Sequence, residues 1–286
     1  MEITVYFQAI VNGLFIGMLY VVVTLGIALV LGIMGIVNFA HGEFYMMGAI
    51  LVWYFFGKLG FNYYLALLVS VLGVAIMGMA TERIFFRPFR GKLLEAFIVA
   101  LALVVIIPNA TTLAVGGMAK QVPSVFSGVL KVWSISFSNE RLTIMLTSAV
   151  LVVLLFLFIR YTKIGRALRA VSQDVDAAQL QGISLNYASS LSMGIGCALA
   201  ALAAGLVAPI YGVTPWIGGP MIMKSMIIII IGGMGSIPGV VLGGLLLGFM
   251  EAFGTLWVSA PTVALLSFVL IIIVLLVRPH GLLGHA

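Results

Sequence analysis

Charged residues are scarce in this sequence. Asp, Glu, Lys and Arg make up only 8% of its 286 residues, whereas 63% are hydrophobic, and the mean hydropathy is +1.29. Soluble domains carry about 25% charged residues, so this composition excludes a soluble globular domain and indicates a chain that lies in a lipid bilayer. The net charge of +6 is then explained by basic residues in loops on one side of the membrane, and we expect no nucleic-acid partner.

Cysteine is nearly absent as well. Cys197 is the only one, which allows neither an internal disulfide framework nor a thiolate metal cage, and its small and apolar neighbours indicate a packing role. His41-Gly42-Glu43 has the H-x-E form of zinc deaminases, but that site also needs a P-C-x-x-C segment. A serine nucleophile motif and a histidine ligand set are missing too. We therefore predict neither an enzyme nor a metal site.

A complete nucleotide-binding motif is also missing. The stretch GGPMIMKS, from Gly218 to Ser225, imitates the end of a phosphate-binding loop, but Met223 stands where the motif G-x-x-x-x-G-K-[ST] requires glycine. The chain is therefore expected not to hydrolyse ATP itself. Lys224 is expected to snorkel or to pair with an acidic group.

Long apolar runs are abundant. A hydrocarbon core about 30 Å thick needs roughly 20 apolar residues in a helix, and several uncharged stretches reach that length, whereas the alternating strands of an outer-membrane barrel are absent. We predict an all-α, polytopic membrane protein with about eight or nine membrane segments. The start, MEITVYFQAI, lacks the basic residues of a signal peptide, so the first segment is expected to stay in the mature protein. The apolar segments lie near residues 7–34, 44–57, 61–81, 95–115, 142–160, 186–209, 216–231, 238–257 and 262–277.

The basic residues indicate the topology. One cluster lies between residues 83 and 92 and another between residues 160 and 169, and the positive-inside rule places both in the cytoplasm. Arg278 places the C-terminus on the same side. The first residues, MEITVY, carry no Lys or Arg, so the N-terminus is expected outside, together with the Ser-, Gly- and Pro-rich segment 116–141.

Two of the apolar segments are poor as uninterrupted crossings. Segment 44–57 has only about 14 residues, fewer than a span needs, and segment 216–231 contains two glycines, a proline and Lys224. Both are candidates for broken or re-entrant helices. A motif G-x-M-G, at 32–35 and again at 232–235, suggests two weakly related halves. In a chain with 33 glycines the match can arise by chance, but repeated halves with short, glycine-interrupted segments are typical of transporters.

Polar residues gather in one otherwise apolar stretch, GIVNFAHGEFYMMGA, at 35–49. Asn38, His41 and Glu43 are costly inside a membrane, so we predict that they line the substrate pathway or act in gating, together with Lys224. In a continuous helix Glu43 would point about 200° away from His41, whereas a break at Gly42 would free backbone groups to line a cavity. The alternative is that these side chains only bond neighbouring helices or lie at the cytoplasmic interface.

The cytoplasmic loop 160–185 is the most informative polar segment. Ser172 is predicted to cap a short helix, with Asp174 and Asp176 in its first turn, where the helix dipole favours acidic residues. Gly182 is predicted to end that helix.

The same short helix carries small residues. Ala177 and Ala178, with Gly182 four residues after Ala178, would suit docking into a groove on a partner protein.

Several motifs along nearly the whole chain resemble one family. D-A-A-x-x-x-G at 176–182 resembles the EAA loop of ABC importer permeases, with Asp176 in place of the usual Glu. GIVNFAHGEFYMMGA at 35–49 resembles the signature of the H-type permease subunit of branched-chain amino acid importers. T-x-x-G-R-A-L-R-A at 162–170 and GGMGSIPGVVLGGLLLG at 232–248 fit the same family in the same order.

The resemblance implies a specific assembly. Residues 1–286 would form a single transmembrane permease domain in a bacterial cytoplasmic (inner) membrane, paired with a second, M-type permease. Two cytoplasmic ATPase subunits would bind ATP and Mg, so this chain would hold no cofactor. They would receive the coupling loop 160–185 at Asp176, Ala177, Ala178 and Gly182. An extracytoplasmic substrate-binding protein would deliver the substrate.

The cargo implied by the resemblance is a branched-chain or related amino acid, although relatives of the family also move urea and short amides. Two other functions compete with an ATP-driven importer. The first is an ion-coupled secondary transporter that would use His41 and Glu43 for coupling. The second is a membrane scaffold or an intramembrane enzyme, which the missing catalytic constellation disfavours.

Overall fold

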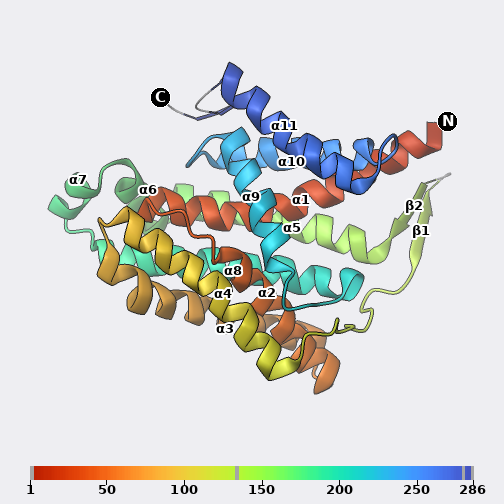
Figure 1. Ribbon diagram of the computed structural model, residues 1–286, viewed down its shortest axis with the longest axis horizontal. Helices are drawn as coiled ribbons and strands as arrows, with labels where there is room; N and C mark the ends of the chain where they lie inside the picture. Colours follow the sequence, from red (N-terminus) through yellow and green to blue (C-terminus); the bar gives the residue numbers. More distant parts are fainter. Residues whose placement is uncertain (1–2, 133–134, 279–280, 285–286) are drawn as a thin grey trace. The chain divides into compact units, whose positions relative to one another are not determined.

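The computed structural model describes residues 3–132, 135–278 and 281–284, and Figure 1 shows a mainly helical chain. Two short strands, β1 (Val129–Val132) and β2 (Ile135–Ser138), form an antiparallel hairpin before α5. The all-α prediction is confirmed, with this hairpin as a minor addition. The helices are α1 (Ile3–Met34), α2 (His41–Val52), α3 (Tyr63–Thr81), α4 (Leu93–Val115), α5 (Asn139–Tyr161), α6 (Lys163–Gln173), α7 (Val175–Leu180), α8 (Leu185–Tyr211), α9 (Gly218–Gly232), α10 (Ile237–Gly254) and α11 (Ala260–Val277), with the short helical turns η1 (Trp53–Lys58), η2 (Glu82–Phe86) and η3 (Arg87–Phe89).

The apolar helices match the predicted membrane segments. Among the described residues, seven helical stretches are long and apolar enough to cross a membrane. Two further helices are short, since α2 has 12 residues and α9 has 15. These two are the segments predicted to be poor as crossings, and neither is among the seven stretches, although α2 continues directly into η1. The seven stretches are Thr4–Met34, Tyr63–Phe89, Leu93–Val115, Asn139–Tyr161, Leu185–Tyr211, Ile237–Gly254 and Ala260–Val277.

The chain divides into two compact units. Unit 1 comprises residues 1–24, 124–152 and 223–286, and unit 2 comprises residues 25–123 and 153–222. Helices α1, α5 and α9 each contribute residues to both units.

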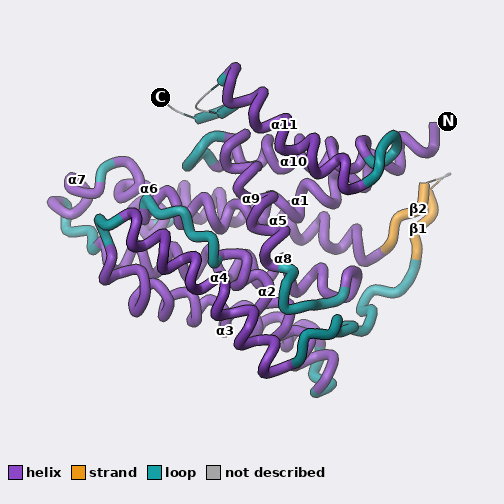
Figure 2. The backbone as a smooth tube through the Cα atoms, in the orientation of Figure 1, coloured by secondary structure: helices purple, strands orange, loops and turns teal. Residues whose placement is uncertain are grey.

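Small residues let the helices of unit 2 approach closely, as is typical of membrane helices. Helices α2, α3 and α8 pack together (Figure 1 and Figure 2). A Cβ atom placed on Gly48 would lie 2.4 Å from the Cα atom of Ala201, and one on Gly78 would lie 2.6 Å from the Sγ atom of Cys197. The Ser70 hydroxyl donates a hydrogen bond to the carbonyl oxygen of Gly48 at 2.8 Å. Cys197 is buried and free, so its predicted packing role is confirmed.

Small residues also allow close helix packing in unit 1, between α1 and α10. A Cβ atom on Gly248 would lie 2.4 Å from the Cα atom of Gly17, and one on Gly13 would lie 2.6 Å from the ring of Phe249. Helix α10 also packs against α11 (Figure 1). The backbones of α1 and α10 are therefore in direct contact.

Both G-x-M-G motifs end a helix. Helix α1 ends at Met34 and α9 ends at Gly232, and the last glycine of each motif takes a left-handed backbone, with φ of +64° at Gly35 and +80° at Gly235. Glycine adopts this conformation without steric cost. The two halves therefore share a helix, a glycine break and a following helix, which agrees with the predicted weak relation between them.

The position of the first break differs from the one that Gly42 suggested. The helix is interrupted between Met34 and His41, and Gly42 is already the second residue of α2. The break begins at Gly35, which takes a positive φ. Gly42 instead has a packing role.

Candidate functional site

Asn38 lies in the break between α1 and α2 and holds it in place. The residue is only 2% exposed. Its side-chain oxygen accepts a hydrogen bond from the Ala40 amide at 3.0 Å, and its side-chain nitrogen donates to the sulfur of Met193 in α8 at 3.6 Å. The first bond satisfies a backbone amide that the break leaves outside a helix. The second ties the break to α8.

His41, the first residue of α2, is fully buried. Its imidazole occupies space that a glycine of α1 leaves open, because a Cβ atom on Gly26 would lie 3.1 Å from Nε2 of His41. The same Cβ atom would lie 2.6 Å from the carbonyl oxygen of Gly196. His41 is therefore packed where α1, α2 and α8 come together.

Glu43 is also buried, with 2% of its surface exposed. Among the residues that the structure describes, its Oε2 atom has no hydrogen-bond partner. That atom lies 3.0 Å from the position that a Cβ atom on Gly218, the first residue of α9, would take. The carboxyl group thus lies in the first turn of α2 and beside the start of α9. A buried polar atom without a partner is costly, which marks Glu43 as a candidate functional residue.

Gly42 and Gly218 join the two short helices. A Cβ atom on Gly42 would lie 2.4 Å from the carbonyl oxygen of Gly218, and a Cβ atom on Gly218 would lie 2.4 Å from the carbonyl oxygen of Gly42. The first turns of α2 and α9 are therefore in backbone contact. The sequence singled out these two segments separately, and the structure brings them together.

His41 and Glu43 lie two residues apart in a continuous helix. Side chains at this spacing point to different sides of a helix. The arrangement disfavours a direct proton relay between them.

Lys224 belongs to a different group, within unit 1. Its ammonium group lies 2.9 Å from Oε2 of Glu251 in α10 and also donates a hydrogen bond to the hydroxyl of Tyr20 in α1. The Tyr20 hydroxyl donates to the same carboxylate oxygen at 2.7 Å. The predicted pairing of Lys224 with an acidic group is confirmed. Its hydrogen bond to Tyr20 could not be predicted from the sequence, because the two residues are 204 positions apart.

A second buried carboxylate lies at the end of α3, and the sequence did not reveal its role. The Glu82 side chain is fully buried, and it accepts hydrogen bonds from Arg87 and Arg90, each at 2.8 Å. The Ser190 hydroxyl in α8 also donates to it. Besides indicating the topology, the basic cluster 83–92 therefore takes part in ion pairs that connect the end of α3 to the start of α8.

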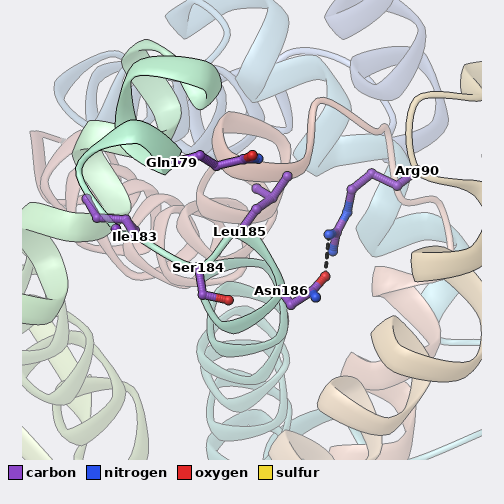
Figure 3. A pocket seen from close by; sticks show the side chains of 7 residues that line it. Arg90, Gln179, Ile183, Ser184, Leu185 and Asn186 are labelled. Atoms are coloured by element: carbon purple, nitrogen blue, oxygen red, sulfur yellow. Dashed lines mark hydrogen bonds between the residues drawn. The ribbon is translucent and has the colours of Figure 1, made fainter.

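This ion cluster borders the coupling loop. Arg90 also donates a hydrogen bond to the side-chain oxygen of Asn186 at 2.6 Å, shown dashed in Figure 3. Both residues line an open depression of about 580 Å³. The other lining residues are Gln179, Gly182, Ile183, Ser184 and Leu185.

The coupling loop contains two helices, α6 and α7. Asp174 caps α7 by accepting a hydrogen bond from the Ala177 amide at 2.9 Å. The predicted cap at Ser172 is wrong, because α6 runs on to Gln173 and leaves Asp174 as the residue with extended backbone before α7. Gly182 has a φ of +80° just after α7. Its predicted role in ending the helix is confirmed.

The four residues predicted to couple to an ATPase differ in exposure. Asp176, Ala177 and Gly182 are exposed, whereas Ala178 is only 3% exposed and faces the inside of unit 2. Leu180, which the sequence did not single out, is 87% exposed. The accessible face of α7 is thus small and partly apolar. Its buried face packs in a cluster with Ile33, Leu168, Val171 and Ala188.

Metal ligands do not gather anywhere in the part of the chain that the structure describes. No group of three or more His, Cys, Asp or Glu side chains there could hold a metal ion.

Long apolar helices, two short helices that meet at glycines and a polar loop between spans define a polytopic membrane protein of the transporter class. The chain belongs to the family described as branched-chain amino acid transport system / permease component, whose model matches residues 9–276.

Its relatives span nearly the same length. The high-affinity branched-chain amino acid transport system permease protein LivH of Escherichia coli (strain K12) is 35% identical over 295 residues, which cover 98% of this chain and 96% of LivH. The corresponding permease protein BraD of Pseudomonas aeruginosa is 35% identical over 299 residues, which cover 99% and 97% of the two chains. A probable LivH of Methanocaldococcus jannaschii is 27% identical over 282 residues, covering 93% and 89%.

A solved structure has a similar fold. PsaBC from Streptococcus pneumoniae in complex with Fab superimposes with a TM-score of 0.51 at 12% sequence identity, over 98% of this chain and 94% of that chain. At this identity the likeness concerns the fold alone.

Proposed function

We propose that this chain is the permease subunit of an ATP-driven importer for branched-chain or related amino acids. Residues 1–286 act as a single permease domain and form half of the translocation pathway. The match of the permease family model to residues 9–276 is the observation that supports this most strongly. LivH and BraD, relatives over almost the whole chain, are described as branched-chain amino acid permeases and indicate the same class of cargo.

The pathway runs beside the contact of α2 with α9. Asn38 holds the break before α2, and His41 and Glu43 act in gating or line the pathway. Broken helices near the substrate are typical of transporters. The Oε2 atom of the buried Glu43 carboxyl group has no partner among the described residues. The cost of burying it supports a functional role, because such a group is rarely kept for stability alone. Lys224, in unit 1, is a further candidate for the pathway or for gating.

Energy reaches the pathway through the coupling loop. The exposed residues Asp176, Ala177 and Gly182 contact an ATPase, while Ala178 anchors α7 to its own unit. ATP and Mg are bound by two cytoplasmic ATPase subunits, so hydrolysis takes place outside this chain. The ion cluster of Glu82, which joins α3 to α8 beside the loop, offers a rigid route for the movement.

The other partners follow from the same class of transporter. A second, M-type permease supplies the other half of the pathway, and an extracytoplasmic binding protein delivers the amino acid. The chain lies in the cytoplasmic (inner) membrane of a bacterium with the N-terminus outside and the C-terminus inside. The positive-inside rule, which assigns both basic clusters to the cytoplasm, supports this orientation.

Purification of the complex at native expression tests the proposal. A tagged chain is extracted in mild detergent, and the subunits that accompany it are identified by mass spectrometry. We expect a second permease and ATPases in stoichiometric amounts. A stable oligomer of this chain alone would contradict the proposal and would favour an ion-coupled carrier.

A further inference from the structure

Three side chains of unit 1 form a charged group among otherwise apolar helices. Lys224 of α9 and Glu251 of α10 are 2.9 Å apart between Nζ and Oε2. Tyr20 of α1 donates to that same oxygen at 2.7 Å and places its ring centroid 4.8 Å from the Lys224 ammonium group. Each member contacts the other two, so the group forms a closed triangle.

The backbone positions this triangle firmly. Tyr20 follows Gly17 by three residues, and Glu251 follows Gly248 by three residues. A Cβ atom on Gly248 would lie only 2.4 Å from the Cα atom of Gly17. Because α1 and α10 touch at these glycines, the hydroxyl and the carboxylate are held at a fixed separation.

Part of this triangle is exposed on the surface of the chain. The Lys224 side chain is 32% exposed and that of Glu251 is 14% exposed. Lys224 is the seventh residue of α9, about 9 Å along the helix from its start. Charged side chains inside a membrane face a water-filled cavity or a protein partner, because exposure to lipid costs several kcal/mol. The exposed side of the pair is therefore expected to face a water-filled cavity or a protein partner rather than lipid.

The pair of Lys224 and Glu251 also has one unused hydrogen-bond donor and one unused hydrogen-bond acceptor. A lysine ammonium group carries three donors, and two of them are directed to Tyr20 and Glu251. Among the described residues, both hydrogen bonds that the Glu251 side chain accepts fall on Oε2, which leaves Oε1 available. One free donor on a cation thus lies next to one free acceptor on an anion.

We propose that Lys224 and Glu251, positioned by Tyr20, bind the charged groups of the transported amino acid. Lys224 donates to the α-carboxylate, and Oε1 of Glu251 accepts from the α-ammonium group. An α-amino acid carries these two groups on one carbon atom, so it can engage both members of the pair at once. Urea and short amides have no full charge and gain much less there. This inference rests on the proposed function and selects amino acids as its cargo.

The competing explanation is that the pair only holds α9 against α10. The two roles differ in how the protein responds when the charges of Lys224 and Glu251 are removed or exchanged. A structural pair tolerates any replacement that preserves attraction or hydrogen bonding, whereas a binding pair needs a cation at 224 and an anion at 251.

The test uses the complete transporter in proteoliposomes with its loaded binding protein and radiolabelled L-leucine. The variants are Lys224→Met, Glu251→Gln, the double amide Lys224→Gln/Glu251→Gln and the charge swap Lys224→Glu/Glu251→Lys. Matched controls at exposed positions are Lys92→Met and Glu95→Gln. Leucine uptake and ATP hydrolysis stimulated by the binding protein are measured together, with thermal stability of the complex as a check on folding.

We expect every variant of the pair to lower leucine uptake at least tenfold while stimulated hydrolysis stays within about threefold of the parent, so that leucine moved per ATP falls. The controls should transport normally. Uptake near the parent rate in the double amide or in the charge swap would overturn the inference, since a structural pair alone would survive either change. Absence of leucine uptake by the parent complex would instead contradict the proposed function.

Discussion

The backbones of Gly42 and Gly218 touch. A Cβ atom on either residue would lie 2.4 Å from the carbonyl oxygen of the other, a distance that no real side chain can occupy. These glycines lie in the first turns of the two short helices, α2 and α9. Their contact places the buried carboxyl group of Glu43 beside the first turn of α9, where we propose that the pathway runs.

Alanine at Gly218 is expected to force α2 and α9 apart. The added methyl group meets backbone rather than a flexible side chain, and overpacking of this kind costs about 1–3 kcal/mol or more. The measurement is thermal unfolding of the purified complex, together with leucine uptake. Gly219→Ala is the matched control, because a Cβ atom there meets nothing within 4 Å. Equal stability of the two variants would show that the close contact is absent.

Replacement of Glu43 by Gln separates function from stability. The amide keeps the size of the side chain but removes the carboxyl group, whose Oε2 atom has no partner among the described residues. We expect thermal stability to stay the same or rise by about 1 kcal/mol, while leucine uptake falls at least tenfold. Wild-type uptake in a correctly assembled Glu43→Gln complex would return Glu43 to a structural role.

Loss of the Glu82 carboxylate is expected to weaken the junction of α3 with α8. Glu82→Gln leaves Arg87 and Arg90 without their anion, and breaking a buried ion pair costs about 3–5 kcal/mol. Because the two arginines are 30% and 28% exposed, we expect the lower end of that range. Chemical denaturation in detergent measures the change. Glu95→Gln, at an exposed position, should shift stability by no more than about 0.5 kcal/mol, and a similar loss in both variants would contradict the role of Glu82.

Two substitutions at Gly182 test how α7 ends. Gly182 has a φ of +80° and open space around its Cβ position, so backbone conformation alone limits what can replace it. Asn tolerates a left-handed backbone, whereas the β-branched Val does not. We expect Gly182→Asn to retain most ATPase binding in a pull-down and Gly182→Val to lose most of it. If both variants bind equally well, the left-handed turn does not matter for docking.

Hydropathy predicted most of the fold. The solvent for this chain is lipid, so each crossing must be a long apolar helix, and the predicted segment 95–115 corresponds closely to α4 (Leu93–Val115). The two segments that were too short, 44–57 and 216–231, correspond to α2 with η1 and to α9. Even the pairing of Lys224 could be predicted, because a lysine in an apolar helix needs a partner.

Contacts between distant residues could not be predicted. Arg87 donates a hydrogen bond to Ser190, 103 residues away, and no periodic pattern in the sequence marks that contact. The sequence allows a break at Gly42, whereas the structure has it between Met34 and His41. Several glycines could allow a break, and only the backbone conformation decides between them. The contact between Gly42 and Gly218 could not be predicted either. In a sequence, a glycine needed for close helix packing cannot be distinguished from one needed for a turn.

Leucine uptake into proteoliposomes tests the central claim most directly. One set of vesicles holds this chain alone, and the other holds the complete complex with its binding protein, each measured with and without ATP on the ATPase side and under an imposed ion gradient. We predict uptake only by the complete complex, only with ATP, and independent of the gradient. Uptake by the single chain, driven by an ion gradient without ATP, would contradict the account.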